Sequence, residues 1–522
     1  MDEQKHFFYT KSLRIIFINK IKNMRISLLL LAFLYVFIAR AQKVADPRPF
    51  ANAITEEGLK KHLYIVASKD FEGRETATEG QRKAAAYIEA NFKSLGLQPG
   101  NKGEFQLYYP VFQDSLVDAA ILVNNQAFQL NEDFAVNITT NHSSTIFGSE
   151  IVFAGYGISD SIRDDYQGLD VKGKIVLLLN GEPATVKQPP AGRRNNFLTK
   201  QQAALKNGAA AVLIIQTKFT GNPVNNKGNM YLSAYKKSIL PNTYYISEKI
   251  TEAIMGPDYS TAKGGSPQPK TYVANVMLQF NKATTHLQSS DVLGFLEGTD
   301  LKDQLLVISA HYDHLGKRDT VVYYGADDDG SGTVGVLEIA EAFGKAKAAG
   351  KGPRRSVLFL ANSGEEKGLW GSEYYSDHPS YPLEKTTVDL NIDMIGRIDP
   401  NRKKGDSTNY VYVIGDDKLS SDLKPISEAQ NRKYSKLELD YKYNDPADPQ
   451  RIYYRSDHYN FARKGVPIIF YFDGIHNDYH RPTDTPDKIN YDLLRKRAQL
   501  VFYTAWEIAN RNDMLKRDIP LK

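Results

Sequence analysis

Short apolar segments, each followed directly by polar side chains, recur through the second half of the chain. They are 305–310 (LLVISA), 356–361 (SVLFLA), 388–392 (VDLNI) and 466–472 (VPIIFYF). Runs of this length and composition predict buried strands. Apolar residues at helical spacing follow the first segment, and a closing amphipathic helix is expected over 494–508. Because strand, loop and helix alternate, we predict an α/β fold with a mixed, largely parallel sheet flanked by helices.

The polar residues that follow these strands are of chemically useful types. They are His311 and Asp313, then Glu365 and Glu366, then Asp393, and finally His476, Tyr479 and His480. An aspartate triplet (327–329) precedes the helix that is expected after the first of these strands. Because the carboxyl ends of parallel strands meet at one edge of a sheet, we expect these side chains to form one site. Each fragment alone also fits a core histidine or a solvated turn, so the prediction depends on the recurrence of the layout.

Imidazole and carboxylate groups without any cysteine favour a zinc, manganese or cobalt site. Two ions close together need a bridging carboxylate and further ligands for each ion. We expect Asp328, the middle residue of the triplet, to bridge. His311 and Asp393 would then hold one metal, and Glu366 and His480 would hold the other.

Three further residues have expected roles beside the metals. Glu365, left over beside a ligand, is expected to act as the general base on a water held between the ions. Asp313 is expected to accept the second imidazole N–H of His311 and so orient that ring. Tyr479 is a candidate donor to the developing oxyanion.

Other residues in the same motifs have plainer alternatives. His314 fits either a supporting role beside the metals or a packed histidine. Asp457, with Ser456 and His458, could mimic a serine hydrolase, but no GxSxG motif is present, so a structural or supporting role is favoured for it. Arg74 is expected to form a structural salt bridge.

At 522 residues, two domains are expected. Residues 42–120 begin the first domain, with helices expected over 54–67 and 80–95. Residues 121–282 have loops rich in Asn, Gly, Pro and Lys and offer no set of ligand residues, so they are expected to form an inserted module. Strands are expected there at 151–155, 174–179 and 209–216, and a helix at 199–207. Residues 283–522 then complete the first domain and hold every candidate ligand.

The amino terminus is expected to be a signal peptide, residues 1–41. Arg25 precedes an apolar run over 26–39, and Ala39-Arg40-Ala41 supplies a cleavage site. Residues 1–23 are interpreted as an over-called extension before Met24, and an uncleaved anchor is the alternative. Secretion or a periplasmic location is therefore expected, without stable membrane insertion after cleavage.

Removal of residues 1–41 leaves 59 basic and 59 acidic residues, because that segment holds seven of the 66 Lys and Arg and two of the 61 Asp and Glu. A net charge of zero offers no basis for predicting nucleic-acid binding. The absence of cysteine excludes disulfides, thiolate ligands and a lipid-anchoring lipobox.

The motifs HYDH, GADDDGSG, NSGEEKGLWGS, NIDMIGR, SDHYNFARKGVP and DYHRPTDT, in this order, resemble the two-zinc exopeptidases of metallopeptidase family twenty-eight. FAGYGISDSIRDDYQGLDVKGKIVLLL resembles the protease-associated (PA) domain often inserted in that family. The resemblance implies two zinc ions, a peptide substrate and a phosphorylase/hydrolase-like fold. The family's ligands fall on His311, Asp328, Glu366, Asp393 and His480, its catalytic glutamate on Glu365, and its Tyr-His pair on Tyr479 and His480, which favours His480 over His476.

Within this resemblance, an aminopeptidase is the leading hypothesis. A carboxypeptidase would use the same metals but would hold a substrate carboxylate, for which Arg397, Arg455 and Arg481 are available. Glutaminyl cyclisation is a further relative of the reaction, disfavoured by the complete two-metal ligand set. A non-catalytic receptor on the same fold remains an alternative from a different class.

Overall fold

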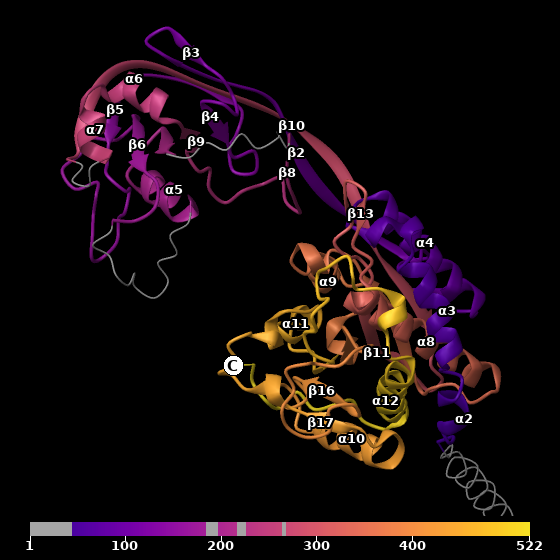
Figure 1. Ribbon diagram of the computed structural model, residues 1–522. Coiled ribbons are helices and arrows are strands. Elements are labelled where there is room, and N and C mark those ends of the chain that lie inside the picture. Colours follow the sequence, from indigo (N-terminus) through magenta and orange to yellow (C-terminus); the bar gives the residue numbers. More distant parts are fainter. Residues whose placement is uncertain (1–43, 184–196, 217–225, 264–267, 522) are drawn as a thin grey trace, which may run out of the picture.

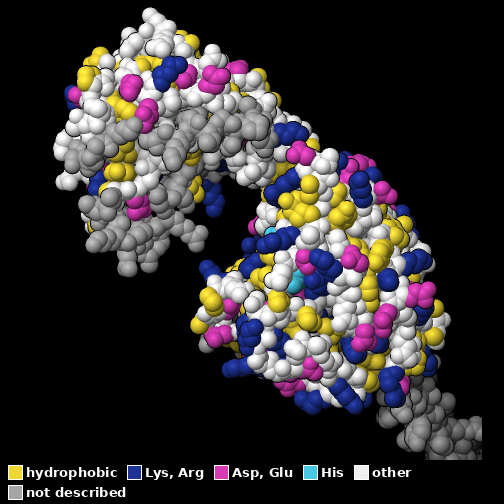
Figure 2. Space-filling model, viewed as in Figure 1, with side chains coloured by type: hydrophobic (Ala, Val, Ile, Leu, Met, Phe, Trp, Pro, Cys, Tyr) yellow, Lys and Arg dark blue, Asp and Glu magenta, His cyan; other side chains and the backbone are white. Residues whose placement is uncertain are grey.

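The computed structural model describes residues 44–183, 197–216, 226–263 and 268–521, so the expected signal peptide lies outside the described residues. Figure 1 shows two lobes joined by a ribbon of two long strands, β2 (Gln106–Val123) and β10 (Lys270–Leu296). Among the described residues, no helix has both the length and the apolar character that crossing a membrane requires. On the face seen in Figure 2, basic and acidic side chains are interspersed over the larger lobe.

The larger lobe is built around seven strands in the order β17-β16-β18-β15-β11-β14-β10. The pairs β11/β14, β11/β15, β15/β18 and β16/β17 are parallel, whereas β10/β14 and β16/β18 are antiparallel. This confirms the expected mixed, largely parallel sheet. The strand bounds are β11 (Leu301–His311), β14 (Arg355–Asn362), β15 (Thr386–Ile392), β16 (Tyr410–Ile414), β17 (Glu438–Asp440) and β18 (Ile468–Phe472), with the short β1 (Gln98–Pro99) beside β10 and the pair β12 (Lys317–Arg318) and β13 (Val321–Val322) apart from the sheet.

Both faces of this sheet are covered, because successive side chains of a strand point to opposite sides. On β14, Val357 and Phe359 join one apolar core, whereas Leu358 and Leu360 join the other. The first core packs against α2 (Arg48–Ala51), α3 (Glu56–Val66), α4 (Glu79–Ser94), α8 (Gly332–Ala348) and α12 (Tyr491–Asn510). The second packs against α9 (Trp370–Asp377) and α11 (His458–Ala462), and α10 (Leu423–Gln430) packs on α12.

Two of the helices that cover the first core begin at a side-chain cap. The Thr55 side chain accepts a hydrogen bond from Gly58 N at the start of α3, and Asn490 accepts one from Leu493 N at the start of α12. Such caps satisfy backbone donors that a helix cannot pair internally. On α4, Ala84, Ile88 and Phe92 are buried at helical spacing, as predicted for this segment.

The smaller lobe continues the same sheet in the order β10-β5-β6-β7-β9-β4. Its strands are β3 (Gln126–Phe128), β4 (Phe134–Val136), β5 (Ser144–Phe153), β6 (Ile175–Leu179), β7 (Ala211–Ile215), β8 (Lys227–Tyr231) and β9 (Asn242–Ile246), and its helices are α5 (Phe197–Lys206), α6 (Glu248–Met255) and α7 (Asp258–Lys263). The expected domain boundaries, 120/121 and 282/283, fall inside β2 and β10, which run unbroken between the lobes. The domain division and the PA assignment stay predictions.

Candidate metal centre and active site

The residues with expected catalytic roles lie at one edge of the larger sheet. His311 is the last residue of β11 and pairs in register with Asn362, the last residue of the neighbouring parallel strand β14. Glu365 and Glu366 follow β14 in a short 3-10 turn, and Asp393 follows β15 directly. The loop between β18 and α12 brings His480 to the same edge.

Asp328 lies between two histidines from different parts of the chain, one at the end of β11 and the other in the loop between β18 and α12. Its Oδ1 is 3.4 Å from His311 Nε2, and its Oδ2 is 3.1 Å from His480 Nε2. His311 Nε2 is also 3.5 Å from Asp393 Oδ1, and His480 Nε2 is 3.2 Å from Glu366 Oε2. The structure therefore groups these five side chains into two clusters that share one carboxylate.

The loop that carries Asp328 is fixed by another buried acid. Asp484 Oδ2 accepts hydrogen bonds from the backbone N–H groups of Asp327 and Asp328, at 2.9 and 3.2 Å. The side chain of Asp329 is used in the same way, because its Oδ1 accepts from Gly332 N and Met394 N. No role was predicted for Asp484 from the sequence, and only the fold shows that its carboxylate contacts the backbone of the aspartate triplet.

Burial and neighbouring charges both shift the pKa values of the histidines and carboxylates in the clusters. Burial by itself lowers the pKa of His311, but the carboxylates of Asp393 and Glu365 raise it well above its ordinary value. In the same way, Asp328 and Glu366 outweigh burial and raise the pKa of His480 to about 10. Burial raises the pKa of Glu365 well above its ordinary range. A cation bound between these groups would compete with the protons on the two imidazoles, because a metal ligand must be deprotonated.

The donor set fits divalent metals. His311 Nε2, Asp328 Oδ2 and Glu366 Oε1 are buried within these ion-pair contacts but make no hydrogen bond of good geometry, which is costly unless another ligand satisfies them. Ligand atoms about 2.0–2.2 Å from a tetrahedral zinc lie roughly 3.3 Å from one another, which matches the separations of 3.1 to 3.5 Å given above. Two triplets have ligand atoms within 4.8 Å of one another: His311, Asp329 and Asp393, and His314, Asp328 and Glu366.

His314 belongs to the site, although the sequence left its place open. It is fully buried, and its Nδ1 lies 2.8 Å from Glu366 Oε1 and 3.8 Å from Asp328 Oδ2. His476 Nε2, by contrast, lies 3.2 Å from Asp327 Oδ2, so this histidine contacts the loop that carries Asp328 and not the two ligand clusters. The only sequence signal for His314 was its closeness to His311 in the HYDH motif.

The expectation for Asp313 was wrong in its detail. The backbone carbonyl of Asp313, and not its carboxylate, lies within hydrogen-bonding distance of His311 Nδ1, at 3.1 Å against 3.7 Å. The carboxylate instead accepts hydrogen bonds from the Thr76 hydroxyl and from Glu365 N. The carboxylate of Asp313 therefore stabilises the turn that carries Glu365. The His311 ring contacts the Asp313 backbone carbonyl instead.

The Ser456-Asp457-His458 sequence forms no hydrolase relay. Asp457 accepts from the Ser372 hydroxyl, and His458 Nε2 bonds to the carbonyl of Tyr453 at 2.7 Å. Burial lowers the pKa of His458 to about 3, so the ring is neutral and acts as packing. This arrangement agrees with the structural role favoured for Asp457.

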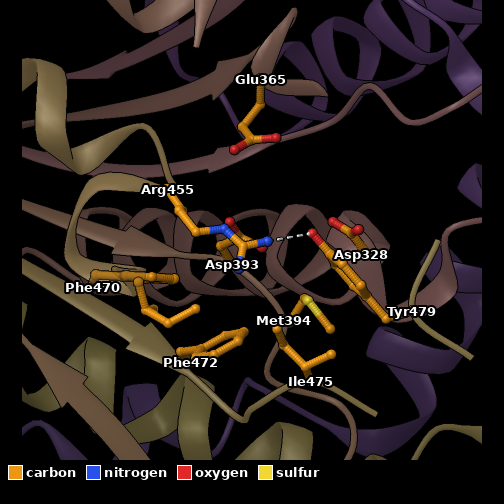
Figure 3. A pocket seen from close by; sticks show the side chains of 10 residues that line it. Asp328, Glu365, Asp393, Met394, Arg455, Phe470, Phe472, Ile475 and Tyr479 are labelled. Atoms are coloured by element: carbon orange, nitrogen blue, oxygen red, sulfur yellow. Dashed lines mark hydrogen bonds between the residues drawn. The ribbon is translucent and has the colours of Figure 1, made fainter. Parts of the chain in front are cut away.

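A small cavity of about 30 Å³ opens beside the candidate metal ligands Asp328 and Asp393 (Figure 3). Arg455 donates from a guanidinium nitrogen to the Tyr479 hydroxyl at 3.2 Å. In Figure 3, Glu365 lies on one side of this pair and the apolar side chains on the other. The apolar lining, which the sequence analysis missed because it belongs to core strands and loops, is Met394, Ile452, Phe470, Phe472 and Ile475.

The remaining arginines are placed elsewhere or engaged otherwise. Arg397 pairs with Asp478 at 3.0 Å and lies 3.8 Å from Asp484. Arg481 is exposed, and neither arginine lines this cavity. Of the three candidates for binding a substrate carboxylate, Arg455 is the one at the site.

Comparisons with known proteins agree with this picture. Residues 291–505 match the model of peptidase family M28. The aminopeptidase YwaD of Bacillus subtilis is 24% identical over 351 residues, which cover 66% of this chain and 64% of that protein, so the chain spans less than two thirds of this curated relative. Two solved structures share the fold: an aminopeptidase from Aneurinibacillus sp. strain AM-1 (TM-score 0.55, 20% identity, 91% of this chain and 100% of that one) and BSAP, a zinc aminopeptidase from Bacillus subtilis (0.51, 19%, 90% and 98%). Over residues 291–505, the chain is therefore similar to peptidase family M28.

Proposed function

We propose that this protein is a zinc-dependent exopeptidase that hydrolyses the first peptide bond at the amino end of peptides, using two Zn²⁺ ions. The observation that carries the proposal is the position of Asp328, whose two carboxylate oxygens face two histidines, one at the end of β11 and one in the loop after β18. A single carboxylate shared in this way is what a pair of neighbouring metal ions requires. Manganese or cobalt would suit the same donor set.

One ion would be held by His311, Asp393 and one oxygen of Asp328, and the other by His480, Glu366 and the second oxygen. When bound, zinc supplies Lewis acidity that lowers the pKa of water and polarises a carbonyl group. His314 touches Glu366, and its buried imidazole orients that carboxylate.

Glu365 is the general base in this proposal. Its Oε2 lies 3.9 Å from His311 Nε2, farther than the ligand atoms are from their partners, so the carboxylate remains outside the metal clusters. Its raised pKa suits a group that takes a proton from the attacking water and later gives it to the leaving amine. An O–H bond of water and the peptide C–N bond break, the water oxygen forms a new C–O bond to the carbonyl carbon, and the proton ends on the new amino group.

Tyr479 supports the developing oxyanion. Because Arg455 donates to the Tyr479 oxygen, one lone pair of that oxygen is occupied and the hydroxyl hydrogen remains available to the substrate. Burial raises the pKa of Tyr479 well above its ordinary value, so the group keeps its proton. Donors of this kind stabilise negative charge that forms only during the reaction.

The cavity favours an apolar residue with a free amino group. Its apolar lining suits an apolar side chain, and the carboxylates of Glu365 and Asp393 suit a substrate ammonium. Arg455 in the same lining supports a second candidate, a carboxypeptidase in which this guanidinium holds a terminal carboxylate. We further propose secretion or a periplasmic location, supported by the apolar run and cleavage sequence within residues 1–41.

Hydrolysis of two matched peptide sets tests the proposal, one set blocked at the amino end and the other at the carboxyl end, with products identified by mass spectrometry. We expect zinc-dependent cleavage that only the amino block abolishes. Loss of cleavage with the carboxyl block alone would establish the carboxypeptidase. A purified protein that binds no divalent ion under zinc-replete conditions would favour a receptor role and contradict the proposal.

A further inference from the structure

The turn that contains Arg74 lies against the loops of the metal centre, although it precedes them by more than 200 residues. Arg74 ends a 3-10 stretch, Lys69–Arg74, with a positive φ of 54°, and its side chain is 1% exposed. The preceding Gly73 also has a positive φ, and a Cβ there would lie 2.4 Å from the Gly316 carbonyl oxygen. The backbone of this turn therefore touches the loop that follows His311.

The Arg74 guanidinium donates hydrogen bonds to four backbone carbonyl oxygens. Nε donates to Tyr312 O at 2.7 Å, and one terminal nitrogen donates to Val66 O at 2.7 Å and Tyr324 O at 2.8 Å. The other terminal nitrogen donates to Gly325 O at 2.9 Å. A single planar group thus joins the end of α3 to two separate loops of the site.

Those two loops carry ligands of both metal clusters. Tyr312 lies between His311 and Asp313 in sequence, and Gly325 lies three residues before Asp328. Two residues after Arg74, the Thr76 hydroxyl donates to Asp313 Oδ2 at 2.7 Å, which adds a second link to the His311 loop.

No ion pair explains Arg74, contrary to the salt bridge expected from the sequence. Among the described residues, no carboxylate oxygen lies within 4.0 Å of the guanidinium, and its partners are carbonyl oxygens. Burial lowers the pKa of Arg74 to about 10, so the group remains charged at neutral pH. A guanidinium offers five N–H donors in a fixed plane, whereas a lysine ammonium offers three donors at one point.

We propose that Arg74, assisted by Thr76, is a positioning residue of the metal centre that holds the His311 loop and the Asp328 loop at the separation that zinc binding needs. This inference rests on the proposed function. It also implies that a segment outside the family match at 291–505 is needed for the metal site. Removal of this link would let the two loops separate, which lowers metal affinity before any step of catalysis.

The test measures zinc affinity of the full-length protein by competition with a chromogenic chelator, in the variants Arg74→Lys and Arg74→Ala. We expect affinity to fall about 10–100-fold in both, the usual range when a residue that supports metal ligands is lost. Lysine keeps the charge but cannot serve four carbonyls. Alanine removes a cation near several carboxylates, which by itself would strengthen zinc binding, so weaker binding in both variants points to geometry.

Arg355 provides the matched control. It is a second fully buried arginine, and it donates to the carbonyls of Ile508, Arg511 and Asn512. It opens β14 at the end opposite to the site, so Arg355→Lys is expected to lower the melting temperature without changing zinc affinity.

Three outcomes would overturn the inference: wild-type affinity in both Arg74 variants, wild-type affinity in Arg74→Lys with tighter binding in Arg74→Ala, or an equal loss of affinity in the Arg355 control. If the Arg74 variants do not fold, Thr76→Val decides, with a few-fold loss expected and an unchanged affinity counting against the inference. A wild-type protein without zinc would refute the proposed function itself, which distinguishes the two failures.

Discussion

The substitution Glu365→Gln tests the proposed base most directly. Glutamine keeps the size and shape of the side chain, and the hydrogen bond from Glu365 N to Asp313 Oδ1 is made by the backbone, so it survives the change. The 3.9 Å separation from His311 places the carboxylate outside the ligand clusters, so zinc content is expected to stay at the wild-type level.

What the variant loses is a proton acceptor. General base catalysis contributes about 10²–10⁴-fold, so kcat should fall by that factor, equivalent to roughly 2.7–5.5 kcal/mol in activation free energy. The assay is steady-state hydrolysis of an amino-terminal leucine peptide, with zinc determined by elemental analysis of the same sample.

The neighbouring Glu366→Gln serves as the control. Its carboxylate oxygens lie 2.8 Å from His314 Nδ1 and 3.2 Å from His480 Nε2, so this variant is expected to lose zinc together with activity. A kcat of Glu365→Gln within about threefold of wild type at full zinc occupancy would refute the reasoning, because a general base is expected to raise kcat by about 10²–10⁴-fold.

Three further predictions concern the bridging carboxylate, the oxyanion donor and a buried carboxyl group of α8. Asp328→Ala should lower zinc content by about two ions per chain, as expected for a bridge between two ions, whereas His480→Ala should lower it by about one; equal losses in elemental analysis would contradict the bridging assignment. Tyr479→Phe should lower kcat about 10²–10³-fold at unchanged zinc content, and an unchanged kcat would exclude it as the oxyanion donor. Glu338 is 2% exposed, and burial raises its pKa from 4.5 to about 7. Between these two pH values the folded state binds more protons than the unfolded state. The free energy of unfolding therefore falls as the pH rises through this window. Glu338→Gln should therefore gain up to about 3 kcal/mol of unfolding free energy over wild type at pH 8 and lose that advantage below pH 4.5; a pH-independent difference in urea denaturation would contradict this.

The fold class and the ligand-bearing strands followed from local pattern. Apolar runs such as 305–310 and 356–361 need burial on both faces, and this requirement is visible in the residues themselves. The polar residues after each run were predictable for the same reason, because the end of a buried strand is where a polar side chain can reach a site. His311 and Asp328 were predicted to belong to one site, and the structure places their nearest atoms 3.4 Å apart.

Other features depended on contacts that no local pattern encodes. The expected salt bridge of Arg74 proved to be a set of hydrogen bonds to four carbonyls, because backbone groups of distant segments are invisible in the sequence. The expected hydrogen bond of the Asp313 carboxylate with His311 proved to involve the Asp313 backbone carbonyl instead, because the carboxylate is engaged by Thr76 and by Glu365 N. The unbroken strands β2 and β10 likewise crossed boundaries drawn from composition.

The sequence by itself therefore determined which elements form and which side chains they present at their ends, since hydrophobic period and residue chemistry act over a few neighbours. Only the tertiary structure decided that His314 faces Glu366, that Phe470 and Phe472 line the cavity, and that Arg74 reaches both ligand loops. These relations join residues far apart in the chain, and their distances depend on strand order and packing.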